Sequence, residues 1–332
     1  MYRMLLGMAI VTLLAIPLAH ANDSTAALAN NGLVFMKNDK IEMRSEELSI
    51  SAEQILVRYH FFNTSDTDVT VHVAFPLPDL DSGDHVEFDV SMPKNFVTAV
   101  NNQAVTTRME QKIFAQGKDH TDVLRGLNIP FVPHAQETNE ALDRLPQERW
   151  AALIEAGLAG IEEFDDGTGA RKHLFVRWIL KTTYYWEQTF PAKAETVIEH
   201  RYQPSVGGSN GTALGDAGAR KEEWFPHYQK RYCLDQQFLS AIERLRVAAK
   251  GRGQDNIPYS EQRIDYILKT GANWAGPIQD FRLVVDKGDA DSLISFCGEG
   301  VKKISSTEFE MRKTNFTPHK DLHILILKKF GE

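Results

Sequence analysis

The sequence predicts a mainly β, α+β fold with two β-sandwich-like regions and helical insertions. Many short segments place apolar residues at every second position, and turns rich in Gly, Asp, Asn and Pro separate them. The 332 residues are 42% hydrophobic and 25% charged, as in folded globular proteins. We expect a β region over 22–105, a helical insertion over 106–170, and a second β region over 171–332 with one inserted helix at about 233–250.

The first 21 residues have the features of a cleavable export signal. Arg3 supplies a positive start, the stretch from Met4 to Ile16 is apolar, and Ala19-His20-Ala21 fits the small-x-small cleavage rule. The apolar stretch is shorter than the roughly 20 residues of a membrane-spanning helix, and an uncleaved anchor is the alternative. We expect cleavage after Ala21, no transmembrane segment in the mature chain, and a location in the periplasm or outside the cell.

The first β region contains two strongly alternating segments, 55–61 and 69–75, with a polar, turn-rich stretch between them. This pattern predicts a β-hairpin in which His60 and His72 lie on one face, either opposite each other or diagonally offset. Two facing imidazoles could bind a metal or act as a pH switch, but a zinc site needs further ligands. Two histidines on a solvated face are the alternative, so we assign no metal.

Apolar residues at helical spacing occur in two segments. In the first, Pro146 suits an initial helical turn, and apolar positions follow from Trp150 to Leu158. This helix either packs against the β regions or covers a site as a lid. In the second, an apolar stripe from Leu234 to Leu245 ends near Gly251, which predicts the helix at about 233–250.

Cys233 and Cys297 are the two cysteines of the chain. In an exported protein an isolated pair most often forms a disulfide, here closing a loop of about 65 residues. Two buried free thiols are the alternative.

Residues 207–211 match the pattern G-x-S-x-G, which makes Ser209 a weak candidate for a catalytic nucleophile. An acid and His319 or His323 follow in the usual chain order. The segment after Ser209 is a weak helix former, however, and the alternating βα pattern of the hydrolase fold is missing. A flexible Gly-rich loop is the alternative.

Aromatic residues supply a possible binding surface. In a strand, Tyr185 points to the face opposite Tyr184 and Trp186, so one side of this run is expected to lie outside the core. Exposed aromatic rings stack on sugars or contact a partner protein, whereas buried ones fill a sandwich core. The candidate surface comprises Tyr184, Tyr185, Trp186, Tyr202 and Trp274.

Several sequence blocks resemble a known family. They are Asn22-Asp23-Ser24, Phe75-Pro76-Leu77-Pro78, 184–191, 200–207, 273–278, Phe281-Arg282-Leu283 and Ser295-Phe296-Cys297-Gly298. Together they resemble the secreted bacterial family called domain of unknown function 4424, over nearly the whole mature chain. The resemblance implies an exported bacterial protein of this one domain type, and it supplies no activity, catalytic residue or binding residue.

Charge and motif content narrow the function classes. Lys plus Arg total 37 and Asp plus Glu total 45, a net charge of −8, which lacks the basic field of non-specific nucleic-acid binding. The residues form no coherent catalytic set and no cofactor motif. We therefore predict a binding or accessory module of the bacterial envelope, non-enzymatic and without cofactor or nucleic acid. Its partner is another envelope protein or a polysaccharide, and a serine hydrolase using Ser209 is the alternative.

Overall fold

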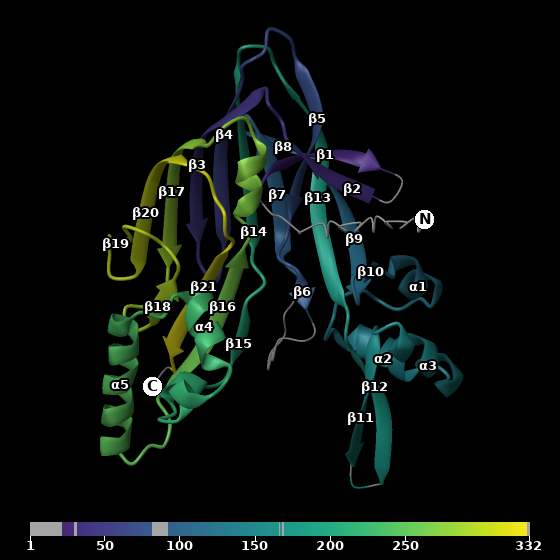
Figure 1. Cartoon of the computed structure of the whole chain (residues 1–332), viewed down its shortest axis with the longest axis vertical. Helices are drawn as coiled ribbons and strands as arrows, with labels where there is room; N and C mark the ends of the chain where they lie inside the picture. The colour runs from purple at the N-terminus through teal and green to yellow at the C-terminus, as the bar shows by residue number, and fades with distance from the viewer. Residues whose placement is uncertain (1–21, 30–31, 82–91, 166, 168, 331–332) are drawn as a thin grey trace, which may run out of the picture.

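The structure, a computed structural model, describes residues 22–29, 32–81, 92–165, 167 and 169–330 (Figure 1). The predicted export signal at 1–21 lies outside the described residues. Strands predominate over helices, and the predicted mainly β, α+β fold class is confirmed. Three sheets and one separate hairpin make up the β structure of the described chain.

The first sheet has seven strands. They are β1 (Ser24–Ala29), β2 (Gly32–Met36), β5 (Val69–Pro76), β6 (Leu80–Asp81), β9 (Arg108–Ala115), β10 (Lys118–Asp119) and β13 (Ile179–Phe190). Their order is β10-β9-β13-β5-β1-β2, and β6 pairs with β13. The paired strands of this sheet are antiparallel.

The second sheet has eight strands, drawn from both β regions that the sequence predicts. They are β3 (Ile41–Ile50), β4 (Ile55–Asn63), β7 (Lys94–Val100), β8 (Gln103–Val105), β14 (Glu195–Gln203), β17 (Ile278–Asp286), β19 (Lys302–Lys303) and β20 (Glu308–Phe316). Their order is β19-β20-β17-β3-β4-β14-β7-β8. The parallel pair of β3 with β17 joins the N-terminal and C-terminal parts of the chain in one sheet. The boundaries drawn along the sequence therefore do not separate two sandwiches.

The third sheet has four strands, and helices cover one of its faces. The strands are β15 (Gly207–Ser209), β16 (Tyr259–Tyr266), β18 (Leu293–Phe296) and β21 (Leu322–Lys329), in the order β15-β16-β21-β18. The helical elements beside it are α4 (Phe225–Tyr232), α5 (Gln236–Gly251), η1 (Ala213–Gly215) and η2 (Ala219–Lys221). Figure 1 shows α4 and α5 beside this sheet.

One central core joins the three sheets. It contains Val73 from the first sheet, Tyr59 and Leu283 from the second, and Ile324 from the third, all without exposed surface. On β21, Leu325 instead packs with the helices on the other face of the third sheet. Because both faces of β21 are covered, its sequence is a continuous apolar run rather than an alternating one.

Three short helices lie within the segment 106–170, where the sequence predicts a helical insertion. They are α1 (Thr121–Gly126), α2 (Gln136–Asp143) and α3 (Gln147–Glu155), followed by the hairpin of β11 (Ala159–Asp165) and β12 (Ala170–Val176). Leu124, Leu142 and Leu153 of these helices share a buried cluster with Ile113 and Trp178 near the end of the first sheet. This shared cluster fixes the insertion on the sheet. The remaining helical element is η3 (Lys269–Asn273).

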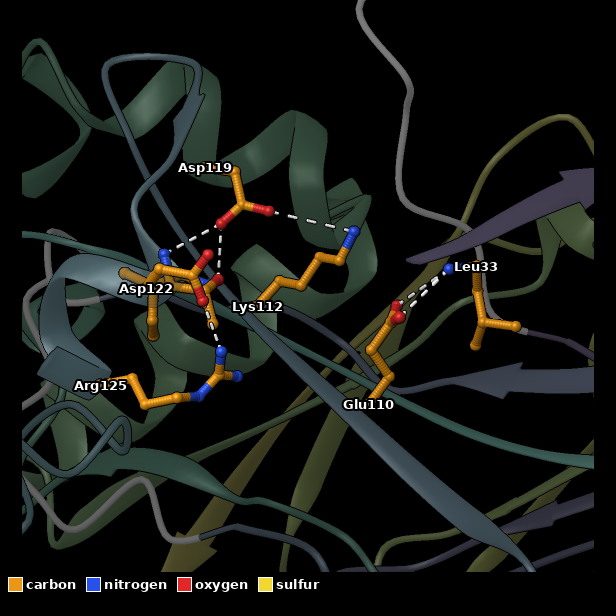
Figure 2. Close-up of polar contacts among 8 residues, drawn as sticks. Leu33, Glu110, Lys112, Asp119, Asp122 and Arg125 are labelled. Carbon is orange, nitrogen blue, oxygen red and sulfur yellow. Dashed lines mark hydrogen bonds and ion pairs between the residues drawn. The ribbon is translucent and has the colours of Figure 1, made fainter. Parts of the chain in front are cut away.

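A side chain of β9 contacts the beginning of β2, although the two strands are not adjacent in the order of the first sheet (Figure 2). The Leu33 main-chain N–H donates to both carboxylate oxygens of Glu110, at 3.1 and 3.3 Å. Gly32 has a φ of +106°, and a Cβ there would lie 2.4 Å from Glu110 Oε1 and from Lys112 Nζ. The positive φ is what requires glycine at this position, since the two nearby atoms are the ends of flexible side chains that can move aside.

The predicted hairpin of 55–61 with 69–75 is wrong. These segments are β4 in the second sheet and β5 in the first. In register, His60 pairs with Ser45 and Val197, and His72 pairs with Ala26 and Glu187. Two apolar strand faces give the same alternation whether the strands pair side by side or pack across a core. The two histidines therefore lie on outer faces of different sheets, with the core between them.

The predicted disulfide is confirmed, because Cys233 and Cys297 are bonded in the structure. The bond joins the end of α4 to the end of β18, across a sequence separation of 64 residues. It thereby attaches α4 to the third sheet. Among the described residues, none of the helices combines the length and apolarity that a membrane span requires.

Replacing both cysteines by alanine is expected to lower the free energy of unfolding by about 2 to 4 kcal/mol, because the bond restricts a long loop in the unfolded chain. Urea unfolding of the oxidised protein and the double variant measures this difference. Dithiothreitol-treated wild-type protein is the control and should match the double variant. An unchanged urea midpoint after reduction would contradict a structural role for the bond.

Candidate functional site

A cavity of about 890 Å³ lies between the third sheet, α4 and the ends of β6 and β14. We call it the groove. Its lining includes Tyr202, Trp224, Tyr228, Glu261, Arg263 and Asp265. These residues come from three separate parts of the chain, so the groove exists only in the folded protein.

One wall of the groove is aromatic. Trp224, Tyr228 and Tyr232 are spaced at i, i+4 and i+8, which places them on one side of α4. The Trp224 and Tyr228 rings are perpendicular with centroids 5.4 Å apart, and the Tyr228 and Tyr232 centroids are 4.7 Å apart. Trp224 is 38% exposed, whereas Tyr232 is buried. We call these three residues the aromatic ladder.

The facing wall is charged. Glu261, Arg263 and Asp265 alternate along β16 and line the groove, while Ile264 and Tyr266 on the opposite face belong to the central core. We call Glu261, Arg263 and Asp265 the charged row. Alternation along one strand thus supplies both a core face and a polar face toward the groove.

Glu261 connects the charged row to the aromatic ladder. One carboxylate oxygen accepts a hydrogen bond from Thr212 Oγ1 at 2.6 Å, and the other accepts one from the Tyr228 hydroxyl at 2.7 Å. Burial, together with the Glu261 charge, raises the pKa of the Tyr228 hydroxyl, so it remains a donor at neutral pH. Burial raises the pKa of Tyr232 to about 12.

The other members of the charged row are also fixed by partners. Asp265 accepts hydrogen bonds from Arg231 Nη2 at 2.9 Å and from His323 Nδ1 at 2.7 Å. Burial opposes ionisation, but these two partners hold the pKa of Asp265 below its usual range. Arg263 Nη2 donates to the Gly208 carbonyl oxygen at 3.1 Å. The row therefore presents oriented charges instead of mobile ones.

Carboxylates outnumber guanidinium groups in the groove. The acidic residues that line it are Asp79, Asp81, Asp216, Glu261 and Asp265, and the arginines are Arg231 and Arg263. This surplus of negative charge favours a neutral or positively charged ligand over an anion.

Comparison with known sequences assigns the protein to a family. The profile described as "Domain of unknown function (DUF4424)" matches residues 21–325. The chain belongs to the DUF4424 family. The resemblance that the sequence blocks indicate is therefore confirmed. A search of curated proteins gives no match to this DUF4424 chain.

One solved structure similar to this DUF4424 chain comes from Legionella pneumophila subsp. pneumophila str. Philadelphia 1 and is described as a candidate nutrient-binding protein. The two chains are 16% identical, and the TM-score is 0.43. The match covers 92% of this chain and 70% of the Legionella chain.

The structure of the DUF4424 chain does not gather the five predicted aromatic residues into one surface. Trp186 and Trp274 are buried in the central core, at 5% and 4% exposure. Tyr184 stacks on Phe96 with ring centroids 4.0 Å apart, and Tyr185 lies on the other face of β13. Tyr202 is also buried, but it lines the groove. Strand alternation and the sandwich core thus separate residues that are close in sequence.

Ser209 lines the groove from edge strand β15, and its hydroxyl donates to the Gly211 carbonyl oxygen at 2.6 Å. Ser209 pairs with Glu261, whereas the bonded pair of Asp265 and His323 lies four residues further along β16. Four strand residues span about 13 Å, so the structure does not bring Ser209 to this acid and histidine. The other predicted histidine, His319, is exposed.

The described part of the chain contains no group of three or more His, Cys, Asp or Glu side chains arranged to bind a metal ion. His60 and His72 are half-buried on the outer faces of the second and first sheets. The geometry therefore gives the two candidate metal ligands no common site.

Sequence reasoning missed the two walls of the groove, although each leaves a signal. The spacing of Trp224, Tyr228 and Tyr232 is helical, and charges occupy every second position from Glu261 to Asp265. The helix α4 has eight residues and is rich in aromatic and basic side chains, so it lacks the apolar stripe that predicts a longer helix.

Proposed function

We propose that this protein is an exported, periplasmic binding protein that holds a carbohydrate of the bacterial envelope in the groove. The export signal at 1–21, with cleavage after Ala21, is part of this proposal. The disulfide supports it, because such bonds persist in oxidising compartments outside the cytosol. No catalytic step is included.

The observation that carries the proposal is that the aromatic ladder and the charged row line the same groove and meet at the hydrogen bond between Tyr228 and Glu261. The C–H face of a sugar ring stacks on an aromatic side chain, while its hydroxyl groups need nearby donors and acceptors. Tyr228, Glu261 and Arg263 provide both kinds of hydrogen-bonding group. The surplus of carboxylates further favours neutral or amine-bearing sugars over acidic ones.

The spacing of the two carboxylates of the charged row supports a binding role for this row rather than glycoside hydrolysis. Glu261 and Asp265 are four residues apart on one strand, a separation of about 13 Å along the backbone. Catalytic carboxylate pairs of glycosidases are closer, at about 5 to 9.5 Å. Both carboxylates already accept two hydrogen bonds each from neighbouring side chains, which suits a fixed recognition surface.

Trp224→Ala is expected to weaken carbohydrate binding at least about tenfold, because it removes the most exposed ring of the ladder. Isothermal titration calorimetry with neutral and amine-bearing envelope oligosaccharides measures the affinity. Phe175→Ala is the matched control, since Phe175 is 39% exposed and does not line the groove. Equal affinities for the wild-type protein and Trp224→Ala would contradict the proposed binding mode.

A further inference from the structure

The segment Asn22–Ser24 lies in the interior of the protein, where each residue has no exposed surface. Trp274 Nε1 donates to the main-chain oxygen of Asp23 at 2.6 Å, and Asn273 Nδ2 donates to Ser24 Oγ at 2.9 Å. These bonds hold the segment against the C-terminal end of η3.

The position of Asn22 depends on a neighbouring glycine. A Cβ at Gly271 would lie 2.8 Å from Asn22 Nδ2, closer than side chains pack. The Asn22 amide occupies this space and donates to Glu46 Oε2 at 2.9 Å. The fold therefore makes room for Asn22 beside a buried carboxylate.

Three buried oxygens around Asn22 have no hydrogen-bond donor among the described residues: Asn22 Oδ1, Asp23 Oδ2 and Glu46 Oε1. The second oxygen of Asp23 does have one, since His200 Nε2 donates to Asp23 Oδ1 at 3.0 Å. A buried acceptor without a donor is costly, and a buried carboxylate without a cation more so. These three oxygens therefore call for a group that supplies several donors and positive charge.

The charges of Asp23, Glu46 and His200 also indicate that the cluster lacks a cation. Asp23 and Glu46 are both fully buried, and His200 can supply at most one positive charge between them. The Glu46 carboxylate accepts a hydrogen bond from the neutral side-chain amide of Asn22. The nearby charge that acts on Glu46 is that of Asp23, which is also negative. One further cation at Asn22 would balance the pair.

We propose that removal of the export signal creates this cation, so that the α-ammonium group of Asn22 is an internal partner of Asp23 and Glu46. Hydrolysis of the Ala21–Asn22 amide bond by water leaves a carboxylate on Ala21 and an ammonium group on Asn22. The ammonium group carries three N–H donors and one positive charge, whereas the amide nitrogen carries one donor and no charge. This inference rests on the export and cleavage that are part of the proposed function.

The ammonium group links removal of the export signal to the stability of the folded protein. The group is covalently part of Asn22, whose side chain already reaches Glu46, and it is one residue from Asp23. The uncleaved chain has an uncharged nitrogen at this buried position. Cleavage after Ala21 therefore stabilises the folded protein, which adds a structural role to the removal of the signal.

The first test measures how accessible the Asn22 amine is. A chain beginning at Asn22 is pulsed with an acetylating reagent, folded and in urea, and peptide mass spectrometry follows the modification. We expect the Asn22 amine to react at least about tenfold more slowly in the folded chain, while the exposed Lys118 reacts at similar rates in both. Equal rates for Asn22 in the folded and unfolded chains would overturn the proposal.

The second test adds one residue. A chain beginning at Ala21 moves the ammonium group away from Asn22, and we expect its folding equilibrium constant in urea to fall at least about tenfold. In Glu46→Gln this penalty should shrink, while in Glu47→Gln, which alters the exposed neighbour on the same strand, it should persist. Equal penalties in both variants would overturn the proposal, and if Glu46→Gln does not fold, the acetylation rates decide.

Other outcomes are also decisive. A reactive Asn22 amine together with stabilisation by Ca²⁺ would assign the cluster to a metal ion and overturn the proposal. N-terminal sequencing of the protein from its own periplasm tests the export proposal separately, and sugar affinity tests the groove. If the export proposal or the sugar-binding proposal fails, the acetylation and unfolding results on the chains beginning at Asn22 and Ala21 still hold. Failure of the proposed function is therefore distinguishable from failure of the Asn22 proposal.

Discussion

Replacement of Asp23 by alanine is expected to lower the free energy of unfolding by about 3 to 5 kcal/mol. His200 is fully buried, and its two ring nitrogens bond to Asp23 Oδ1 at 3.0 Å and to Thr98 Oγ1 at 2.9 Å. The substitution leaves Nε2 without its acceptor in the interior. It also opens space beside His200, whose ring packs against Phe75 and Trp186.

Urea unfolding followed by circular dichroism measures this loss. Asp39→Ala is the matched control, because Asp39 is exposed and its replacement is expected to change stability by less than about 0.5 kcal/mol. Asp23→Asn keeps an acceptor oxygen for His200 and separates loss of charge from loss of the hydrogen bond. If Asp23→Ala is as harmless as Asp39→Ala, the buried network around His200 is not a determinant of the fold.

The second large effect is a loss of stability with rising pH in the chain that begins at Ala21, where the ammonium group is moved from Asn22. Burial raises the pKa of Glu46 from 4.5 to about 8, opposed by the Asn22 hydrogen bond and reinforced by the Asp23 charge. The folded chain then holds a proton that the unfolded chain releases above about pH 4.5. Glu46 therefore contributes full stability below that pH, and up to about 4 kcal/mol is lost as the pH rises to about 8.

Unfolding in urea at pH 5, 6.5 and 8 tests this dependence in both chains. The chain beginning at Asn22 should lose less stability, because an ammonium group favours the ionised carboxylate. Asp23, Tyr59 and Tyr266 also act on this region, so Glu46→Gln in the longer chain is the control that isolates Glu46. Parallel pH profiles for the two chains would contradict a specific role of the Asn22 amine.

The strand content of the protein was predictable from alternation, but the pairing of strands was not. The segments 55–61 and 69–75 have the pattern of a hairpin, yet they belong to two sheets that face each other. Alternation reports that one face of a strand is buried, and it carries no information on which partner provides the hydrogen bonds. The parallel contact of β3 with β17 depends on residues more than 200 positions apart, which no local pattern reveals.

The candidate groove was not predictable for a related reason. Its aromatic wall at 224–232 and its charged wall at 261–265 meet only through the third sheet, and β6 reaches the groove from far earlier in the chain. The disulfide was predictable because the two cysteines leave one pairing. The burial of Asn22–Ser24 was not predictable, since three small polar residues after a predicted export signal are typical of an exposed terminus.

Carbohydrate binding in the groove, through the aromatic ladder and the charged row, is open to direct measurement. The measurement is native mass spectrometry of the chain beginning at Asn22, incubated with soluble envelope glycan fragments. We predict a bound species whose added mass corresponds to whole sugar residues, and we predict its loss in Trp224→Ala with retention in Phe175→Ala. A spectrum of the unliganded chain alone, or an adduct that persists unchanged in Trp224→Ala, would contradict carbohydrate binding by the aromatic ladder.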